Sequence, residues 1–165
     1  MAVLHGILYM VALGVISHVV GQALPRRWFD WTRFPYASAK WEKRGAVYEK
    51  LHIRRWKNRL PDMSRVLKDM VPKRMDRDVG AAEVEVLIRE TCVAELVHAV
   101  LFVLAPTIVH VCKHIVGVIF AALFAAGNVP FILIQRYNRP KLVCLWERMK
   151  KREERGNSAH TDTVG

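Results

Sequence analysis

Two long apolar blocks, separated by strongly basic sequence, constrain this chain more than any other feature. Residues 3–24 contain no Lys, Arg, Asp or Glu, and residues 92–135 carry only Glu95 and Lys113 as charges. About 20 apolar residues are enough for one helix to cross a bilayer. The first block therefore predicts one transmembrane helix, and the second, which is about twice as long, predicts two.

The predicted fold class is an all-α integral membrane protein, with about three membrane-embedded helices plus interfacial helices. The second block is interpreted as a helical hairpin that turns between Cys112 and His114. Pro106 leaves open a re-entrant break in one longer segment, because proline removes a helical hydrogen bond. Gly21 and Ala23 also have a spacing typical of signal-peptide cleavage, but the lack of Lys or Arg before the apolar stretch favours an uncleaved anchor.

Basic residues accumulate in the segments that flank the apolar blocks. Residues 25–91 hold 17 Lys and Arg against 10 Asp and Glu, a net charge of +7, and residues 136–165 hold 8 against 4, a net charge of +4. Because Lys and Arg are enriched in cytoplasmic flanks, both segments are predicted to be cytoplasmic, with the N-terminus and hairpin tip outside. The predicted regions are thus an anchor (1–24), a basic aromatic-rich interfacial segment (25–91), the hairpin (92–135) and a basic tail (136–165), disordered from Arg155 onward.

The first basic segment has the composition of a membrane-surface region. Tryptophan, tyrosine and basic residues alternate between Arg26 and Arg59, a pattern typical of the headgroup layer. From Met63 to Val71 apolar residues recur at helical spacing, which predicts an interfacial amphipathic helix. Membrane lipid is the expected partner and nucleic acid is not, because the bases flank apolar spans. The three cysteines have no paired spacing, so neither a disulfide framework nor a zinc finger is predicted.

Glu95 and His98 form the first candidate constellation. Glu95 is the only acid in either apolar block, where a carboxylate must face a partner or a polar cavity. His98 follows at a spacing that places both on one helical face, so Glu95 is expected to orient and support a general-base imidazole. The alternative is a buried pair that only joins helices. A Glu-x-x-His pair could also ligate di-iron, but the second such motif is lacking, so no metal is predicted.

The last apolar span supplies the second half of the candidate site. Asn128 and Gln135 are seven residues apart and share a helical face, and the hairpin brings them to the depth of Glu95. Arg136 and Arg139 follow, where guanidinium groups could receive a phosphate or stabilise an oxyanion. Anchoring of the span at the cytoplasmic face is the alternative role for both arginines.

These motifs together resemble one known family. They are Arg89-Glu90-Thr91-Cys92-Val93-Ala94-Glu95-Leu96-Val97-His98, Asn128-Val129-Pro130, Gln135-Arg136-Tyr137-Asn138-Arg139-Pro140 and, upstream, Arg55-Trp56-Lys57 with Leu60-Pro61-Asp62. Over nearly the whole chain the sequence resembles the glycosyl-4,4'-diaponeurosporenoate acyltransferases, small bacterial membrane proteins of staphyloxanthin-type carotenoid biosynthesis. One departure is Ala99, where the family pattern has a tryptophan, a difference that bears on the shape of the acceptor pocket.

The resemblance implies a multi-pass enzyme of the bacterial cell membrane that moves a fatty acyl group from an acyl thioester to a sugar hydroxyl of a membrane glycolipid, such as a glycosylated carotenoid. It implies acyl-CoA or an acyl-carrier donor as co-substrate, and no other cofactor. His98 would take the hydroxyl proton, Glu95 would hold the imidazole, and Asn128, Gln135 or Arg136 would stabilise the oxyanion. The substrate-binding candidates are Arg54, Arg55, Trp56, Lys57, Thr91, Tyr137, Asn138 and Arg139. The alternative function is a non-catalytic membrane adaptor that binds anionic lipid or a partner protein.

Overall fold

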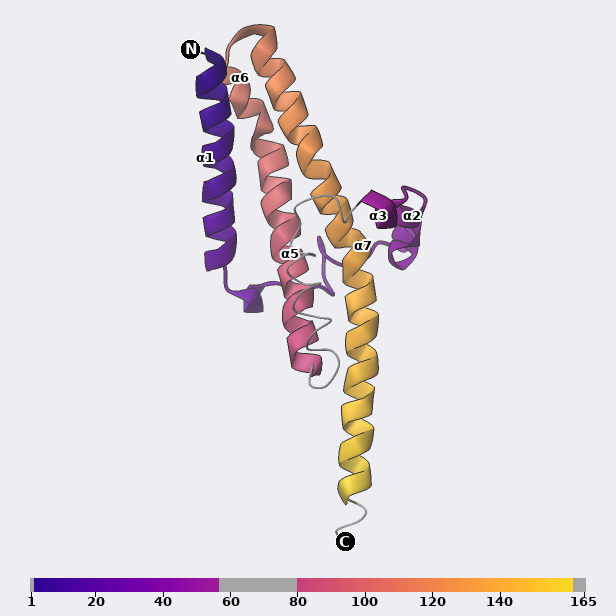
Figure 1. The fold of residues 1–165 in the computed structure, drawn as a ribbon. Coiled ribbons are helices and arrows are strands. Elements are labelled where there is room, and N and C mark those ends of the chain that lie inside the picture. The colour runs from indigo at the N-terminus through magenta and orange to yellow at the C-terminus, as the bar shows by residue number, and fades with distance from the viewer. Residues whose placement is uncertain (1, 57–79, 162–165) are drawn as a thin grey trace.

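A computed structural model describes residues 2–56 and 80–161 of the chain, and these residues form helices and connecting loops without any strand (Figure 1). Three helices are long and apolar enough to cross a membrane, in the spans Val3–Ala23, Ala81–Val111 and His114–Arg155. The predicted all-α fold class with three membrane helices is therefore confirmed. The interfacial helix predicted between residues 63 and 71 lies outside the described residues.

Helix α1 (Ala2–Ala23) is apolar on all sides. Its 22 residues reach about 33 Å at 1.5 Å per residue, close to the ~30 Å hydrocarbon core of a bilayer. Leucine and valine side chains are exposed along most of its length, including Leu8, Val15 and Val19. A helix that is hydrophobic all round requires an apolar surrounding, and in this protein most of that surface is open to lipid.

Helix α5 (Ala81–Leu104) continues through a short 3₁₀ segment, η4 (Ala105–Thr107), into α6 (Ile108–Val111). Pro106 lies at the start of η4 and only perturbs the helix locally. The chain then reverses at residues 112–113, within the predicted tip, and α7 (His114–Thr161) returns beside α5 (Figure 1). Gly117 permits this tight turn, because a Cβ atom there would lie 1.6 Å from the Cys112 carbonyl oxygen.

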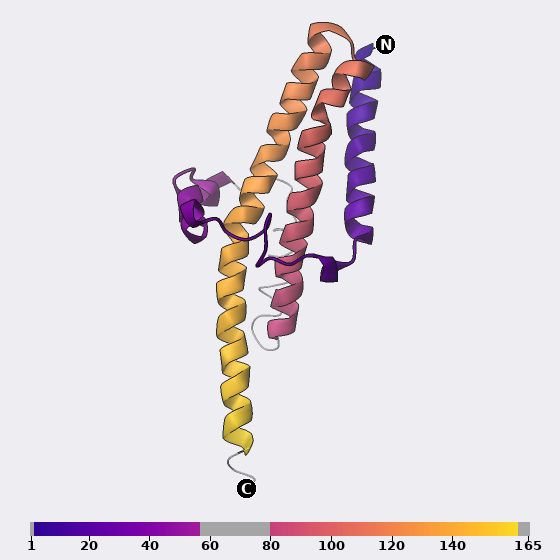
Figure 2. The same cartoon turned by 180° about the vertical axis from the view of Figure 1, so that it is seen from behind.

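Helix α7 is 48 residues long and extends well past the other two long helices (Figures 1 and 2). At 1.5 Å per residue its length is about 72 Å, more than twice a hydrocarbon core. Residues 136–161 are therefore helical, and the predicted disorder from Arg155 is wrong as far as Thr161. Pro130 and Pro140 both lie inside this helix, so neither proline ends it.

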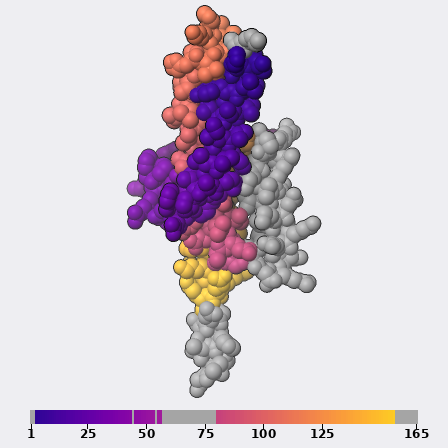
Figure 3. Space-filling model, turned by 90° about the vertical axis from the view of Figure 1, so that its left-hand side faces the viewer, coloured from indigo at the N-terminus to yellow at the C-terminus, as the bar shows by residue number. Residues whose placement is uncertain are grey.

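The segment from the end of α1 through α3 packs across the long helices as a series of short helical turns. It contains η1 (Arg26–Trp28), η2 (Lys40–Gly45), α2 (Ala46–Glu49) and α3 (Ile53–Trp56), and Figure 3 shows it below the end of α1. Its inner side chains anchor it in two small cores. Phe29 packs with Cys92 and Val93 of α5, whereas Tyr48 and Ile53 pack with Ile134 and Tyr137 of α7.

The end of α1 is held against α5 by polar and close apolar contacts. Arg26 pairs with Glu90 at 2.6 Å and also donates to the carbonyl oxygens of Gly21 and Leu24 at 2.8 and 2.6 Å. Gly21 is buried, and a Cβ atom there would lie 2.7 Å from Cγ2 of Val97. The two helices can approach this closely only because position 21 has no side chain.

We predict that Gly21→Val destabilises the packing of α1 on α5, because the β-branched Val97 has little rotamer freedom to move aside. The expected loss is about 1–3 kcal/mol, typical of overpacking, measured as a lower melting temperature in detergent micelles. Gly14→Val is the matched control, since nothing lies within 4 Å of its Cβ position. An equal effect of both substitutions would contradict a close contact at Gly21.

Candidate active site

Polar side chains from α5 and α7 meet in the interface between these two helices, which pack on each other more extensively than any other pair of elements that the structure describes. The buried members of this set are Thr91, Glu95, Asn128, Gln135 and Arg139, and His98 and Arg136 are partly buried beside them. Thr91, Glu95 and His98 are spaced by four and three residues on α5, and Asn128, Gln135 and Arg139 are spaced by seven and four on α7, which keeps each set on one face of its helix, with Arg136 next to Gln135. The structure thus brings together the polar cluster that the sequence predicts for the hairpin.

The carboxylate of Glu95 lies between two arginines of α7. Its Oε1 accepts a hydrogen bond from Nε of Arg136 at 2.9 Å, and its Oε2 accepts one from Nη2 of Arg139 at 2.5 Å. Only 6 % of Glu95 is exposed, so its charge would be costly without cations at this range. The two arginines are three residues apart and therefore reach it from one face of α7.

Nearly all the N–H groups of the Arg139 guanidinium donate hydrogen bonds within the protein. Nε donates to Oγ1 of Thr91 at 2.9 Å, Nη2 also donates to the Thr91 carbonyl oxygen at 3.0 Å, and Nη1 donates to the Tyr36 carbonyl oxygen at 2.7 Å. With the bond to Glu95, four of its five N–H groups have partners, and the side chain is buried. Arg139 and Thr91 therefore join the helices, and the expected contact of Arg139 with donor phosphates stays a prediction.

Arg136 connects the helices to the segment that precedes α2. Its Nη1 donates to Oε1 of Glu42 at 2.6 Å, and its Nη2 donates to the Pro35 carbonyl oxygen at 2.6 Å. Glu42 is only 1 % exposed and also accepts from the Tyr48 hydroxyl and, at 2.6 Å, from the Ala39 amide. Two carboxylates and two guanidinium groups thus form one buried cluster without net charge, which we call the ion-pair cluster (Glu42, Glu95, Arg136, Arg139).

Sequence reasoning missed Glu42. It lies in a basic, aromatic-rich stretch between Trp41 and Lys43, where an acid ordinarily faces solvent, and its partner Arg136 is 94 residues away. Burial raises the pKa of Glu42, but the hydrogen bonds from Tyr48, Arg136 and the Ala39 amide outweigh it and hold the pKa below its ordinary value. Burial, and then Glu42, raise the pKa of Tyr48, so this phenol stays protonated as a donor.

His98 is paired with an amide. Its Nδ1 lies 2.8 Å from Oδ1 of Asn128, and its ring stacks on Phe131 with the centroids 4.4 Å apart and the planes 8° from parallel. Asn128 donates through Nδ2 to the Phe124 carbonyl oxygen at 2.8 Å, which assigns its oxygen to the side facing the imidazole. Because that oxygen can only accept, Nδ1 carries the proton, and Nε2 is the basic nitrogen of the neutral ring.

This arrangement differs from the expected dyad of Glu95 and His98. Both oxygens of Glu95 accept from arginines, and Asn128 supplies the hydrogen bond that orients the imidazole. The physical reason is charge: a buried carboxylate is stabilised far more by two guanidinium groups than by a neutral ring. Asn128 therefore has the orienting role, and one of its two side-chain N–H groups is bonded to the Phe124 carbonyl oxygen.

The other predicted substrate-binding residues lie on a different face of α7 or outside the cluster. Tyr137 is buried in the small core with Tyr48 and Ile53, and Lys141 Nζ lies 3.6 Å from its ring centroid. Trp56 packs against the same core and donates to the Leu51 carbonyl oxygen at 2.9 Å, so it is a packing residue here. The remaining candidates are Arg55, which is exposed, Asn138, which is half-buried, Arg54, whose side chain is not described, and Lys57, which is outside the described residues.

Comparison with known proteins assigns this chain to a family. Residues 25–148 match the family described as glycosyl-4,4'-diaponeurosporenoate acyltransferase. Proteins of that name from Staphylococcus aureus strains bovine RF122 / ET3-1 and MRSA252 are 33% identical over 143 residues, which cover 82% of this chain and 82% of each relative. The chain belongs to the glycosyl-4,4'-diaponeurosporenoate acyltransferase family. No solved structure matches it.

Membership in the glycosyl-4,4'-diaponeurosporenoate acyltransferase family makes the chain an acyltransferase and removes the adaptor alternative. The matched residues include the whole ion-pair cluster and the imidazole–amide pair of His98 and Asn128. They exclude the whole of α1 and the last turns of α7, so the cluster belongs to the part of the chain that carries the family likeness.

We predict that Glu95→Gln strongly destabilises this acyltransferase, because two buried arginines would lose their shared carboxylate. Removing one partner of a buried ion pair typically lowers the free energy of unfolding by about 3–5 kcal/mol, which can be measured by unfolding in detergent. Glu49→Gln is the control, since the ion pair between Glu49 and Lys141 is exposed and such pairs contribute about 0–1 kcal/mol. Comparable losses in both variants would show that the cluster does not hold the helices.

The lowered pKa of Glu42 predicts a specific acid sensitivity. Its contribution to stability is complete above the ordinary glutamate pKa of about 4.3 and is lost as the pH falls through the lower pKa of the folded state. Glu42→Gln should therefore be less stable at neutral pH and should lose less stability than the parent below about pH 4.3. Unfolding midpoints across pH 3–7 test this, and parallel curves would contradict it.

Proposed function

We propose that this acyltransferase moves a fatty acyl group from an acyl thioester to a sugar hydroxyl of a membrane glycolipid, such as a glycosylated carotenoid. The name of the family and of the Staphylococcus aureus relatives, which specifies a glycosylated carotenoid acid and acyl transfer, supports this proposal. The single structural observation that carries it is the imidazole of His98, oriented by Asn128 beside a buried ion-pair cluster.

In the proposed reaction His98 acts as the general base. Nε2 takes the proton of the acceptor hydroxyl as its oxygen attacks the thioester carbonyl, and the resulting oxyanion collapses with cleavage of the carbon–sulfur bond. The leaving thiolate receives the proton back from Nε2, so the imidazole ends the cycle neutral. The partial exposure of His98 and the surrounding apolar surface suit an acceptor that approaches from the lipid.

Arg136 and Gln135 are the proposed oxyanion donors. Three of the five N–H groups of Arg136 are bonded to Glu95, Glu42 and the Pro35 carbonyl, which leaves two in a side chain that is 21% exposed. Gln135 is buried on the same helix beside it. A preorganised donor in a site of low polarity stabilises a developing oxyanion strongly. Asn128 is assigned a positioning role, because its oxygen faces the imidazole.

The proposed sidedness places residues 25–91 and the end of α7 in the cytoplasm. Their net charges of +7 and +4 support this orientation, because Lys and Arg accumulate on the cytoplasmic side. An acyl thioester made in the cytoplasm would then meet the lipid-borne acceptor near Arg136. Arg136 lies 22 residues after the start of α7, about 33 Å along the helix, at the depth where a hydrocarbon core would end.

We predict that His98→Ala folds but loses acyl transfer by about 10² to 10⁴-fold, the usual contribution of a general base. The assay is transfer from palmitoyl-CoA to glycosyl-4,4'-diaponeurosporenoate by purified protein, normalised to folded protein. His18→Ala in α1 is the control and should retain activity. Asn128→Ala should lower kcat with little change in either KM, as expected of a positioning residue. Wild-type turnover by His98→Ala would refute the proposed mechanism.

The sidedness can be tested with a native thiol. Cys144 is exposed on α7, whereas Cys92 and Cys112 are buried. An impermeant maleimide should leave Cys144 unlabelled in intact cells and label it after permeabilisation. Lys113→Cys at the hairpin tip, in a Cys144→Ser background, is the control and should be labelled in intact cells. Labelling of Cys144, but not of Lys113→Cys, in intact cells would contradict the proposed topology.

A further inference from the structure

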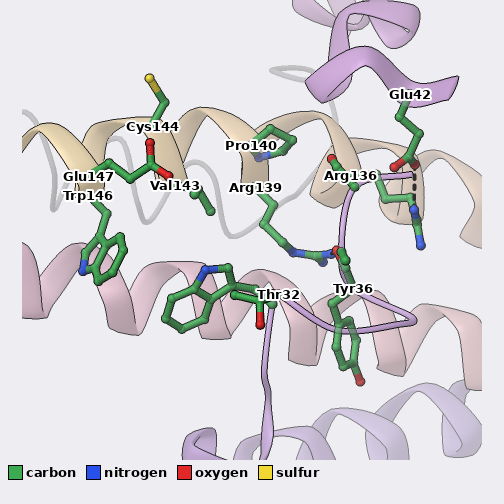
Figure 4. A pocket seen from close by; sticks show the side chains of 13 residues that line it. Thr32, Tyr36, Glu42, Arg136, Arg139, Pro140, Val143, Cys144, Trp146 and Glu147 are labelled. Carbon is green, nitrogen blue, oxygen red and sulfur yellow. Dashed lines mark hydrogen bonds and ion pairs between the residues drawn. The ribbon is translucent and has the colours of Figure 1, made fainter. Parts of the chain in front are cut away.

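A groove runs along α7 beyond the ion-pair cluster, and no pattern in the sequence indicates it. It encloses about 350 Å³ between α7 and residues 31–42 (Figure 4), within the size range of small-molecule sites. On α7 its lining extends from Arg136 to Glu147. Eleven residues of helix rise about 16 Å, so the groove suits an elongated guest rather than a single compact ring.

The inner end of the groove has charged residues but no net charge to attract an anion. Arg136 and Arg139 line it, but the buried carboxylates of Glu42 and Glu95 neutralise both. The N–H groups that remain on Arg136 and Arg139 can donate to carbonyl oxygens. This end therefore favours a neutral guest with hydrogen-bond acceptors over a phosphate, whose charge would compete with two carboxylates.

The outer end of the groove is aromatic and leads to a basic stretch. Trp31 and Trp146 meet edge to face with centroids 5.8 Å apart, and Nζ of Lys150 lies 5.2 Å from the Trp146 ring. Lys150 is exposed about one turn beyond the groove, on the side of α7 that Val143 and Trp146 occupy, and Lys151 is exposed on the adjacent face of the helix. Glu147 is the acid at this rim. A guest with an anionic outer end would meet the two lysines.

We propose that this groove binds the pantetheine arm of the acyl thioester donor, with the thioester at Arg136 and the phosphate end of the arm at Lys150 and Lys151. The arm is neutral, carries two amides, and contains about 12 backbone bonds, as many as four peptide residues, which gives about 14 Å when extended. That length matches the groove. The assignment rests on the proposed acyl transfer, and it locates the donor on the side of the ion-pair cluster opposite His98.

Thiol protection tests the assignment without any acyl transfer. Figure 4 shows Val143 directed to the same side of α7 as Trp146 and Arg139, and Cys144 directed away from them. In a Cys144→Ser background, alkylation of Val143→Cys by N-ethylmaleimide should slow about tenfold at palmitoyl-CoA or S-palmitoyl-pantetheine concentrations ten times the dissociation constant. Leu145→Cys in the same background is the control, because Leu145 does not line the groove, and its alkylation should be slowed much less. Palmitate and octyl glucoside should protect neither thiol.

The probes distinguish the possible occupants. Protection by both thioesters supports recognition of the shared arm, whereas protection by palmitoyl-CoA alone would assign recognition to the nucleotide and overturn the proposal. Equal protection by palmitate would reduce the groove to an acyl-chain site, and protection by octyl glucoside would make it a sugar site; either outcome overturns the proposal. Protection without any acyl transfer would leave the groove assignment standing and refute the proposed function.

Kinetics provide an independent measurement. Val143→Trp fills the groove and should raise the donor KM about tenfold or more, close to 1.4 kcal/mol, with little change in the acceptor KM. Leu145→Trp adds the same bulk to α7 at a position that does not line the groove, and it should leave the donor KM unchanged. An increase confined to the acceptor KM would overturn the assignment.

Discussion

The carboxylate of Glu95 between Arg136 and Arg139 is the interaction on which the rest of this structure depends. It lies in the interface of α5 and α7, and an unpaired charge there would favour separation of the two helices. The carboxylate of Glu95 neutralises only one of the two arginine charges. Glu42, from the segment before α2, neutralises the other. The same four side chains therefore fix the helix pair and hold the connecting segment on it.

The ion-pair cluster, which has no net charge, also separates the two parts of the proposed active site. On one side lies the imidazole of His98, oriented by an amide and stacked on Phe131 among apolar side chains. On the other side lies a groove with aromatic walls that ends at the basic part of α7. In the proposed reaction, a lipid-borne acceptor and a water-soluble donor approach from opposite sides. Arg136, which lines the groove and pairs with Glu95 one turn before His98, is the residue at which they would meet.

The sequence predicts the helices better than it predicts their contacts. Apolar blocks with few or no charges specify α1 and the hairpin, because a helix satisfies the backbone of a single apolar segment within that segment. The helicity of residues 147–154 was also available in principle, since Glu, Lys, Arg and Met are strong helix formers.

The partners of the polar residues could not be predicted in the same way. Spacing places Glu95 and His98 on one face, but the choice between an imidazole and two arginines depends on the rotation of α7 about its axis. Glu42 reaches Arg136 across 94 residues, and its own neighbours indicate only a solvated turn. The groove is likewise formed by residues 31–42 folding onto α7, a long-range contact that no local pattern encodes.

The central claim is that an amide, and not the buried carboxylate, orients the imidazole of His98. Nitrogen-15 NMR of histidine-labelled protein in micelles tests this claim most directly, with the His98 signals assigned by comparison with His98→Ala. The account predicts that Nδ1 carries the proton in the neutral form of the ring, a tautomer that is kept in folded Glu95→Gln and lost in Asn128→Ala. A tautomer that is unchanged by Asn128→Ala but altered by Glu95→Gln would contradict the account.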